Sequence, residues 1–140
     1  MSGESGGSGT PGPPPARRFR EGGDGSYEEA AGYSRAVRRG SSICVSGTTA
    51  RGTPLPASTY DQTLDCLRRV ISAVEALGGD RGSILRTRIY LAPGADWSEA
   101  SAAHRELLGE VAPANTLLYV GALVGTGLLV EVEADAEVLA

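Results

Sequence analysis

From residue 130 to residue 138, every second side chain is apolar, and acidic residues stand between them. The apolar set is Val130, Val132, Ala134, Ala136 and Val138, and the acidic set is Glu131, Glu133, Asp135 and Glu137. A period of two predicts a β-strand that buries one face and exposes the other. Residues 113–120 predict a further strand, and we expect residues 121–127 to turn the chain back between the two as a hairpin.

Two stretches have helical periodicity instead. The first begins with a cap at Thr59 or Asp61 and runs to about Leu77, where Gly78 and Gly79 end it. Its apolar residues fall three or four positions apart and form one stripe: Leu64, Leu67, Val70, Ile71, Val74 and Leu77. The second predicted helix covers residues 97–108, with an inward stripe of Trp97, Ala100, His104, Leu107 and Leu108.

The remaining patterns predict three more strands. Residues 33–39 and 42–47 are expected to form a hairpin around Gly40 and Ser41. Residues 84–91 predict a strand with Leu85, Thr87, Ile89 and Leu91 on one face and Arg86, Arg88 and Tyr90 on the other. The predicted order is β-β-α-β-α-β-β. It indicates an α+β fold with both helices on one face of a mixed sheet.

Residues 1–26 differ from the rest of the chain because Gly, Ser and Pro dominate and large apolar side chains are scarce. Such a segment buries too little surface to offset its ordering entropy, so we expect a disordered tail. Residues 27–140 are expected to form the folded domain. The basic cluster of Arg17, Arg18 and Arg20 is interpreted as solvated charge, with contact to an acidic partner as the alternative.

Composition and charge narrow the range of partners. The chain of 140 residues has a net charge of −4, and all 13 basic residues are arginine, so no strong field attracts nucleic acid or an anionic membrane. No apolar run is long enough to span a bilayer, and the start of the chain lacks the pattern of a secretion signal. Cys44 and Cys66 have no metal-binding spacing. We expect two buried free thiols, a cytoplasmic protein, and neither metal nor cofactor.

Several short motifs occur in an order that resembles the Rid/YjgF family, the reactive intermediate deaminases. The motifs are YSRAV at 33–37, VSGT at 45–48, DQT at 61–63, IYL at 89–91, DW at 96–97, PA at 113–114 and VEVEA at 130–134. The resemblance covers nearly all of the chain from residue 33 onward. It implies a chorismate-mutase-like fold assembled as a homotrimer, with small-molecule sites in the clefts between subunits.

The resemblance also implies roles for particular residues. Glu133 matches the acid that positions or activates water, Tyr33 matches a substrate-contacting tyrosine, and Gly47-Thr48 matches a segment whose backbone amides face the ligand. This role is also chemically reasonable without the resemblance, because a carboxylate can exchange a proton with a water that attacks a C=N bond. Glu131 lies on the same strand face as Glu133 and is a second candidate. The competing interpretation is that these acids only solvate the outer face of the strand.

Two positions depart from the family pattern. Family members that hydrolyse imines have arginine directly after Pro-Ala, where it binds the substrate carboxylate, but this chain has Asn115. An amide offers only neutral hydrogen bonds in place of a charge-assisted pair, which costs roughly 1–2 kcal/mol of affinity. A cysteine often found two positions later is replaced by Leu117. Arg88 is expected to pair with the acidic strand face, and supplying the missing anion contact is its alternative role.

Two functions remain open at this stage. The first is a Rid-like enzyme that adds water or a proton to an imine, an enamine or a related reactive small molecule, with a non-standard substrate of specialised metabolism. The second is a non-catalytic trimer that binds a small molecule or a partner protein in the same clefts. The retained Tyr33, Gly47 and Glu133 favour the enzyme, and Asn115 favours the binding protein. A fold alone does not decide between them.

Overall fold

The computed structural model of the protein describes residues 9, 11–12, 15–21 and 27–139. Its elements in chain order are β1 (Arg17–Phe19), α1 (Tyr27–Ala31), β2 (Ala36–Arg39), β3 (Ser42–Thr49), α2 (Thr59–Ala76), the 3-10 helix η2 (Arg81–Ser83), β4 (Ile84–Leu91), α3 (Trp97–Leu108), β5 (Ala114–Tyr119) and β6 (Val130–Glu137). The predicted β-β-α-β-α-β-β order and the α+β class are confirmed, with β1, α1 and η2 in addition. None of the helices in these described ranges combines the length and the apolar character that crossing a membrane requires.

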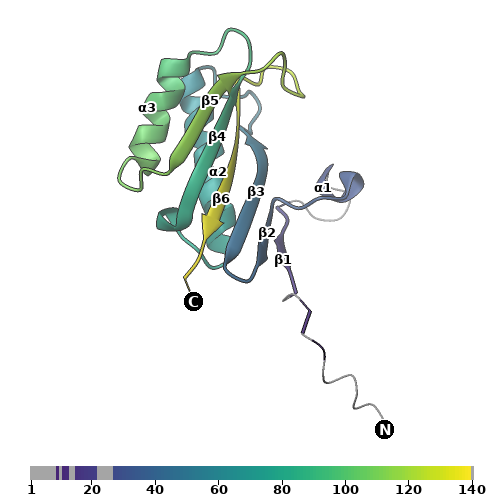
Figure 1. Cartoon of the computed structure of the whole chain (residues 1–140). Helices are drawn as coiled ribbons and strands as arrows, with labels where there is room; N and C mark the ends of the chain where they lie inside the picture. Colours follow the sequence, from purple (N-terminus) through teal and green to yellow (C-terminus); the bar gives the residue numbers. More distant parts are fainter. Residues whose placement is uncertain (1–8, 10, 13–14, 22–26, 140) are drawn as a thin grey trace.

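The six strands form one sheet in the order β1-β2-β3-β6-β4-β5 (Figure 1). Strands β4 and β5 are parallel, and the other pairs are antiparallel. In Figure 1, α2 lies behind β3, β6 and β4 with α3 beside it, and α1 stands apart at the β1–β2 side. The sheet therefore has one face covered by α2 and α3 and one face without them, which we call the open face.

The predicted hairpin between residues 113–120 and 128–138 is wrong. β4 lies between β5 and β6, so these two strands do not pair. The segment that joins them passes the end of β4 and is hydrogen-bonded to the chain there at both of its ends. Val120 N donates to Leu91 O at 2.9 Å, and Ala92 N donates to Leu129 O at 3.0 Å. The connection is thus a crossover, and the alternating strand becomes a central strand of the sheet.

Burial on β6 follows the predicted alternation. Val130, Val132, Ala134 and Ala136 are almost fully buried, whereas the acidic residues between them are partly or fully exposed. On β4, Thr87, Ile89 and Leu91 are buried as predicted, but Leu85 is 56% exposed. The cause is a register shift between Ile84 and Arg86 against β6, which turns Ile84 into the core in place of Leu85.

Helix α2 supplies most of the helical side of the core. The predicted stripe from Leu64 to Leu77 is buried. The cap is Ser58 rather than Thr59 or Asp61, because the Ser58 hydroxyl accepts from Asp61 N at 3.0 Å. Gly78 ends the helix with a φ of 95°, a conformation that favours glycine.

Helix α3 begins after the Asp96 cap and packs through small residues. Ala100, Ala103 and Leu108 are buried, but Trp97 is 57% exposed, which corrects its place in the predicted stripe. The first turn of α3 meets the first turn of α2 through polar groups instead. Asp96 N donates to Thr59 Oγ1 at 3.0 Å, and Tyr60 N donates to a Glu99 oxygen at 3.0 Å.

The two cysteines also differ from the expectation that both are buried. Cys66 on α2 is buried, and burial raises the pKa of its thiol to about 12. Cys44 is exposed, because Ile43 and Val45 on either side of it in β3 point into the core.

The prediction of disorder over residues 1–26 is wrong at residues 17–21. β1 pairs with β2, with Phe19 opposite Ala36, and the half-buried Phe19 packs against the core. Arg35 N also donates to Phe19 O at 2.8 Å. A three-residue strand here covers the edge of β2, which would otherwise present unpaired backbone groups. The rest of the predicted tail includes residues 1–8, 10, 13–14 and 22–26, which lie outside the described residues.

Candidate functional site

Three of the four acidic residues of β6 have a side-chain partner on a neighbouring strand or turn. Tyr90 of β4 donates to Glu133, and this hydrogen bond to a carboxylate raises the pKa of the tyrosine. Arg88 Nη1 lies 3.2 Å from Asp135 Oδ2, and the Ser41 hydroxyl donates to Glu137 at 2.8 Å. Within the described part of the chain, Glu131 has no such partner. It is therefore the acid of β6 whose carboxylate remains available for another group.

The Glu131 carboxylate lies against Gly47 of β3. A Cβ atom placed on Gly47 would overlap Glu131 Oε2, and it would stand 3.0 Å from Glu131 Cδ. The β3–β6 register shifts between Val45 and Thr48, so the strand bulges at this point. A bulge re-aims the backbone locally, and the glycine leaves room for the carboxylate beside it.

Two pockets meet at Gly47 and Glu131. The larger has a volume of about 640 Å³, and Tyr27, Tyr33 and Val124 form its less polar lining. The smaller has a volume of about 310 Å³, and Tyr90, Leu123 and Glu133 are part of its wall. Because both pockets are lined by Gly47 and Glu131, one carboxylate faces two adjoining spaces. We call Gly47, Glu131 and these two pockets the candidate cleft.

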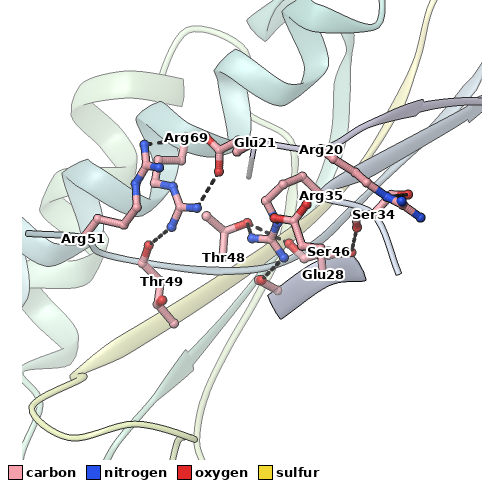
Figure 2. A network of polar contacts seen from close by, with 11 residues as sticks. Arg20, Glu21, Glu28, Ser34, Arg35, Ser46, Thr48, Thr49, Arg51 and Arg69 are labelled. Atoms are coloured by element: carbon pink, nitrogen blue, oxygen red, sulfur yellow. Dashed lines mark hydrogen bonds and ion pairs between the residues drawn. The ribbon is translucent and has the colours of Figure 1, made fainter. Parts of the chain in front are cut away.

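A buried arginine holds the bulge in place (Figure 2). Arg35 donates from Nη2 to Gly47 O at 2.9 Å and from Nη1 to Thr48 Oγ1 at 3.2 Å. Its Nε lies 3.1 Å from Glu28 Oε2 of α1, and both side chains are nearly inaccessible to solvent. The guanidinium also lies 5.6 Å from the centre of the Tyr33 ring. Arg35 thus connects α1, Tyr33 and the Gly47 backbone.

A second network forms another wall of the larger pocket. Arg69 of α2 donates to Glu21 at 2.5 Å, and Arg51 Nη2 lies 3.6 Å from the other oxygen of Glu21 (Figure 2). Arg69 also donates to Thr49 O. Six charged side chains, three acidic and three arginine, therefore line this pocket: Glu21, Glu28, Glu131, Arg35, Arg51 and Arg69.

The structure brings together several of the residues named from the sequence. Tyr33, Gly47 and Glu131 line the larger pocket, and Glu133 joins Gly47 and Glu131 at the smaller one. The side chain of Thr48 does not face the cleft, because it is buried and donates to Ser46 O at 2.7 Å while accepting from Arg35. The expected pairing of Arg88 with the acidic face is present at Asp135.

Asn115 and Leu117 lie elsewhere in this chain. In the β4–β5 register they stand opposite Thr87 and Ile89, two buried residues that face the helices. The Asn115 amide donates to Thr87 Oγ1 at 3.0 Å, and this hydroxyl lies 2.7 Å from His104 Nε2. Burial lowers the pKa of His104, which is half-buried on α3. Within this chain, Asn115 is thus hydrogen-bonded on the helix side of the sheet and Glu131 lies on the open side.

Sequence reasoning missed most of the charged lining of the larger pocket. Arg35 falls within the strand predicted over residues 33–39, but β2 begins only at Ala36. Glu21 belongs to the segment predicted to be disordered, and Arg69 lies off the apolar stripe of α2. No local motif marks these residues, because strands and helices distant in sequence bring them together. Among the described residues, no group of three or more His, Cys, Asp or Glu side chains is arranged to hold a metal ion.

Comparisons with known proteins agree with this architecture. The model of the family described as endoribonuclease L-PSP matches residues 25–138. The uncharacterised protein SCO2049 of Streptomyces coelicolor is 36% identical over 113 residues, which cover 79% of this chain and 84% of that protein.

Solved structures give the same result. Rv2704 of Mycobacterium tuberculosis, a member of the YjgF/YER057c/UK114 family, is 38% identical with a TM-score of 0.80, over 89% of this chain and all of that one. The YjgF gene product of E. coli shares the fold at 23% identity, with a TM-score of 0.72 over 86% of this chain and 98% of that one. From the family match together with these similarities, we conclude that the chain belongs to the endoribonuclease L-PSP family, also known as the YjgF/YER057c/UK114 or Rid family.

Proposed function

We propose that the candidate cleft hydrolyses an imine or an enamine, with Glu131 as the group that moves the proton. The observation that supports this most is the state of Glu131. It faces both pockets, it lies against a glycine, and within the described residues it has neither a hydrogen-bond nor an ion-pair partner. A carboxylate without a structural partner is free to bind and deprotonate a water molecule.

The reaction is balanced with water as the only co-reactant. Glu131 takes a proton from water while the oxygen attacks the carbon of the C=N bond, and Glu131 then passes this proton to the nitrogen, which becomes an amine. The resulting carbinolamine collapses to a carbonyl compound, and ammonia or an amine leaves. An enamine reaches the same path after its carbon is protonated to give the imine.

The other residues of the cleft position these groups. Arg35 fixes the carbonyl oxygen of Gly47 and so the bulge on which Glu131 rests. Tyr33 and Tyr27, whose ring centroids are 6.1 Å apart, give the substrate an aromatic wall. Glu133 was the first candidate from the sequence, but its carboxylate already accepts from Tyr90. We therefore assign Glu133 to orienting Tyr90 and assign the proton transfer to Glu131.

We also propose that the protein assembles as a homotrimer. The open face carries the polar side chains of β4 and β6, and neighbouring subunits that meet there would enclose the cleft. Light scattering should then give a mass three times that of the 14.4 kDa chain. A monomer at micromolar concentration would contradict this assembly.

The second candidate function is a non-catalytic trimer that binds a small molecule in the same cleft. Asn115 favours it, because its amide is hydrogen-bonded to Thr87 and does not reach the open side of the same subunit. A ribonuclease function, which the family description mentions, is less well supported. The net charge of −4 and the acidic side chains of β6 would repel a phosphate backbone.

The experiment compares three variants on freshly generated imines with and without a carboxylate. Glu131→Gln should lower turnover by about 10²-fold or more, the usual scale for losing a general acid–base. Glu133→Gln should lower it less, and Glu137→Gln, which changes an acid bonded to Ser41, should leave it unchanged. Circular dichroism would show that all three are folded. If the wild type hydrolyses no imine faster than buffer does, the binding function takes the place of the enzymatic one.

A further inference from the structure

We propose that Arg51 and Arg69 form a carboxylate-binding site in the larger pocket, and that Glu21 of the chain itself occupies this site in the structure. A carboxylate of the substrate would take the place of Glu21. The biological use of this site rests on the proposed function. The site would hold an acidic substrate in a chain that has asparagine instead of arginine at position 115.

The geometry is that of carboxylate recognition. One oxygen of Glu21 lies 2.5 Å from Arg69 Nη2, and the other lies 3.6 Å from Arg51 Nη2. Each oxygen therefore faces a separate guanidinium, an arrangement that a carboxylate of a ligand can reproduce. Glu21 is the only carboxylate that either arginine side chain contacts within the described residues.

Arg69 and the backbone of Arg51 are positioned without the help of Glu21. Arg69 extends from α2 and donates to Thr49 O, which fixes the plane of its guanidinium. The backbone of Arg51 is held in place because its N–H donates to Asp65 at 2.7 Å. Removal of Glu21 would thus leave the Arg69 guanidinium in place, with the exposed side chain of Arg51 beside the vacated carboxylate position.

The site is open to a ligand on one side. The Arg69 side chain is only 13% exposed, and its Nε is buried without a hydrogen-bond partner, whereas Arg51 is 61% exposed. One arginine therefore anchors the carboxylate at the wall of the pocket, and the other reaches it from the solvent side. Both line the pocket that Glu131 also lines, so a bound acid can extend toward the proposed catalytic carboxylate.

Glu21 can leave by rotation of its side chain alone. The preceding strand β1 is held independently, through its pairing with β2 and through Phe19. Glu21 also lies outside residues 25–138, which match the family model. Glu21 competes with an acidic ligand and so raises the concentration at which that ligand binds.

The test measures binding and not turnover. Benzoate and benzamide have the same ring, which suits the lining of Tyr27, Tyr33 and Val124, but only benzoate has a carboxylate. Isothermal titration of the full-length protein should show that Glu21→Gln binds benzoate about 10-fold more tightly than the wild type. This is the gain expected if Glu21 occupies the site in about nine-tenths of the wild-type molecules. The affinity for benzamide should not change.

Two further variants show which arginine contact matters. Arg51→Gln in the Glu21→Gln protein should remove most of the gain, whereas Arg68→Gln, a change of the exposed neighbour of Arg69 outside the pocket, should not. Glu131→Gln should retain benzoate binding, so failure of the proposed catalysis and failure of this site give different results. Equal affinity of wild type and Glu21→Gln for benzoate, with both proteins folded, would overturn the proposal, and so would a matching gain for benzamide.

Discussion

Replacement of Gly47 by alanine tests whether the Glu131 carboxylate must lie where the structure has it. The new Cβ would overlap Glu131 Oε2 and stand 3.0 Å from Glu131 Cδ, and ordinary contacts begin near 3.4 Å. The carboxylate oxygen therefore has to move by about 1 Å. It belongs to the end of a flexible side chain, so the movement is cheap for folding. We expect the variant to lose less than about 1 kcal/mol of stability, a change typical of mild substitutions.

The expected effect on turnover is much larger than the effect on stability. Displacement of a catalytic group by about 1 Å can cost about 10²-fold in rate, and we expect a loss of roughly that size here. Gly47 has no φ in the left-handed region, so alanine adds no backbone strain, and its carbonyl oxygen can still accept from Arg35. Turnover of an accepted imine and thermal unfolding of the same preparation are the two measurements.

The matched control is Gly121→Ala in the connection between β5 and β6. A Cβ at Gly121 would meet nothing within 4 Å, so activity and stability should both stay as in the wild type. In a Glu131→Gln background, Gly47→Ala should lower turnover no further, because the group it displaces has already lost its function. Full activity of Gly47→Ala would refute the role of the Glu131 position. A large loss of stability would refute the claim that the side chain can yield.

Three further predictions concern the surroundings of the cleft. Deletion of residues 1–21 should lower the free energy of unfolding by about 1–3 kcal/mol, because half-buried Phe19 leaves the core and Arg69 loses Glu21. Deletion of residues 1–12 should leave the free energy of unfolding unchanged. Equal melting temperatures of the two deletion variants would contradict this prediction. Arg35→Leu should cost about 3–5 kcal/mol by leaving Glu28 buried and unpaired, and adding Glu28→Leu should recover part of the loss in a urea titration. Because the pKa of His104 is lowered in the folded protein, the unfolded chain binds a proton at His104 more readily than the folded chain does. The free energy of unfolding should therefore fall as the pH drops below about 6.5. The His104→Gln variant should lack this dependence between about pH 7 and pH 5.

The sequence predicts the elements well wherever periodicity is strong. The stripe of α2 and the alternation of β6 are long enough that only one structure satisfies them, and both are confirmed. The order of the strands in the sheet does not follow from periodicity. β5 and β6 follow each other in the chain, and adjacency in sequence favours a hairpin, but β4 separates them. The residue pattern of one strand does not predict which strands pair with it.

Local departures from periodicity are equally invisible in the sequence. A register shift beside Leu85 exchanges it with Ile84, and both are apolar, so the pattern is the same either way. β1 has three residues within a segment rich in Gly and Pro, and only the free edge of β2 makes it a strand. At the candidate site, Glu131 and Glu133 lie on the same strand face and look equivalent. They differ because one stands beside Gly47 and the other beside Tyr90, and cross-strand register decides this.

The position of β6 has a consequence for how the chain folds. It follows the five other strands in sequence, yet it lies between β3 and β4. Until residues 130–137 are in place, the sheet exists only as two separate pieces, β1-β2-β3 and β4-β5, each with an exposed inner edge. Contacts this far apart in sequence form slowly, because a long loop must close before they stabilise anything. The partly folded chain therefore presents two unpaired edges at once, and its lifetime determines how long the protein is exposed to aggregation during folding.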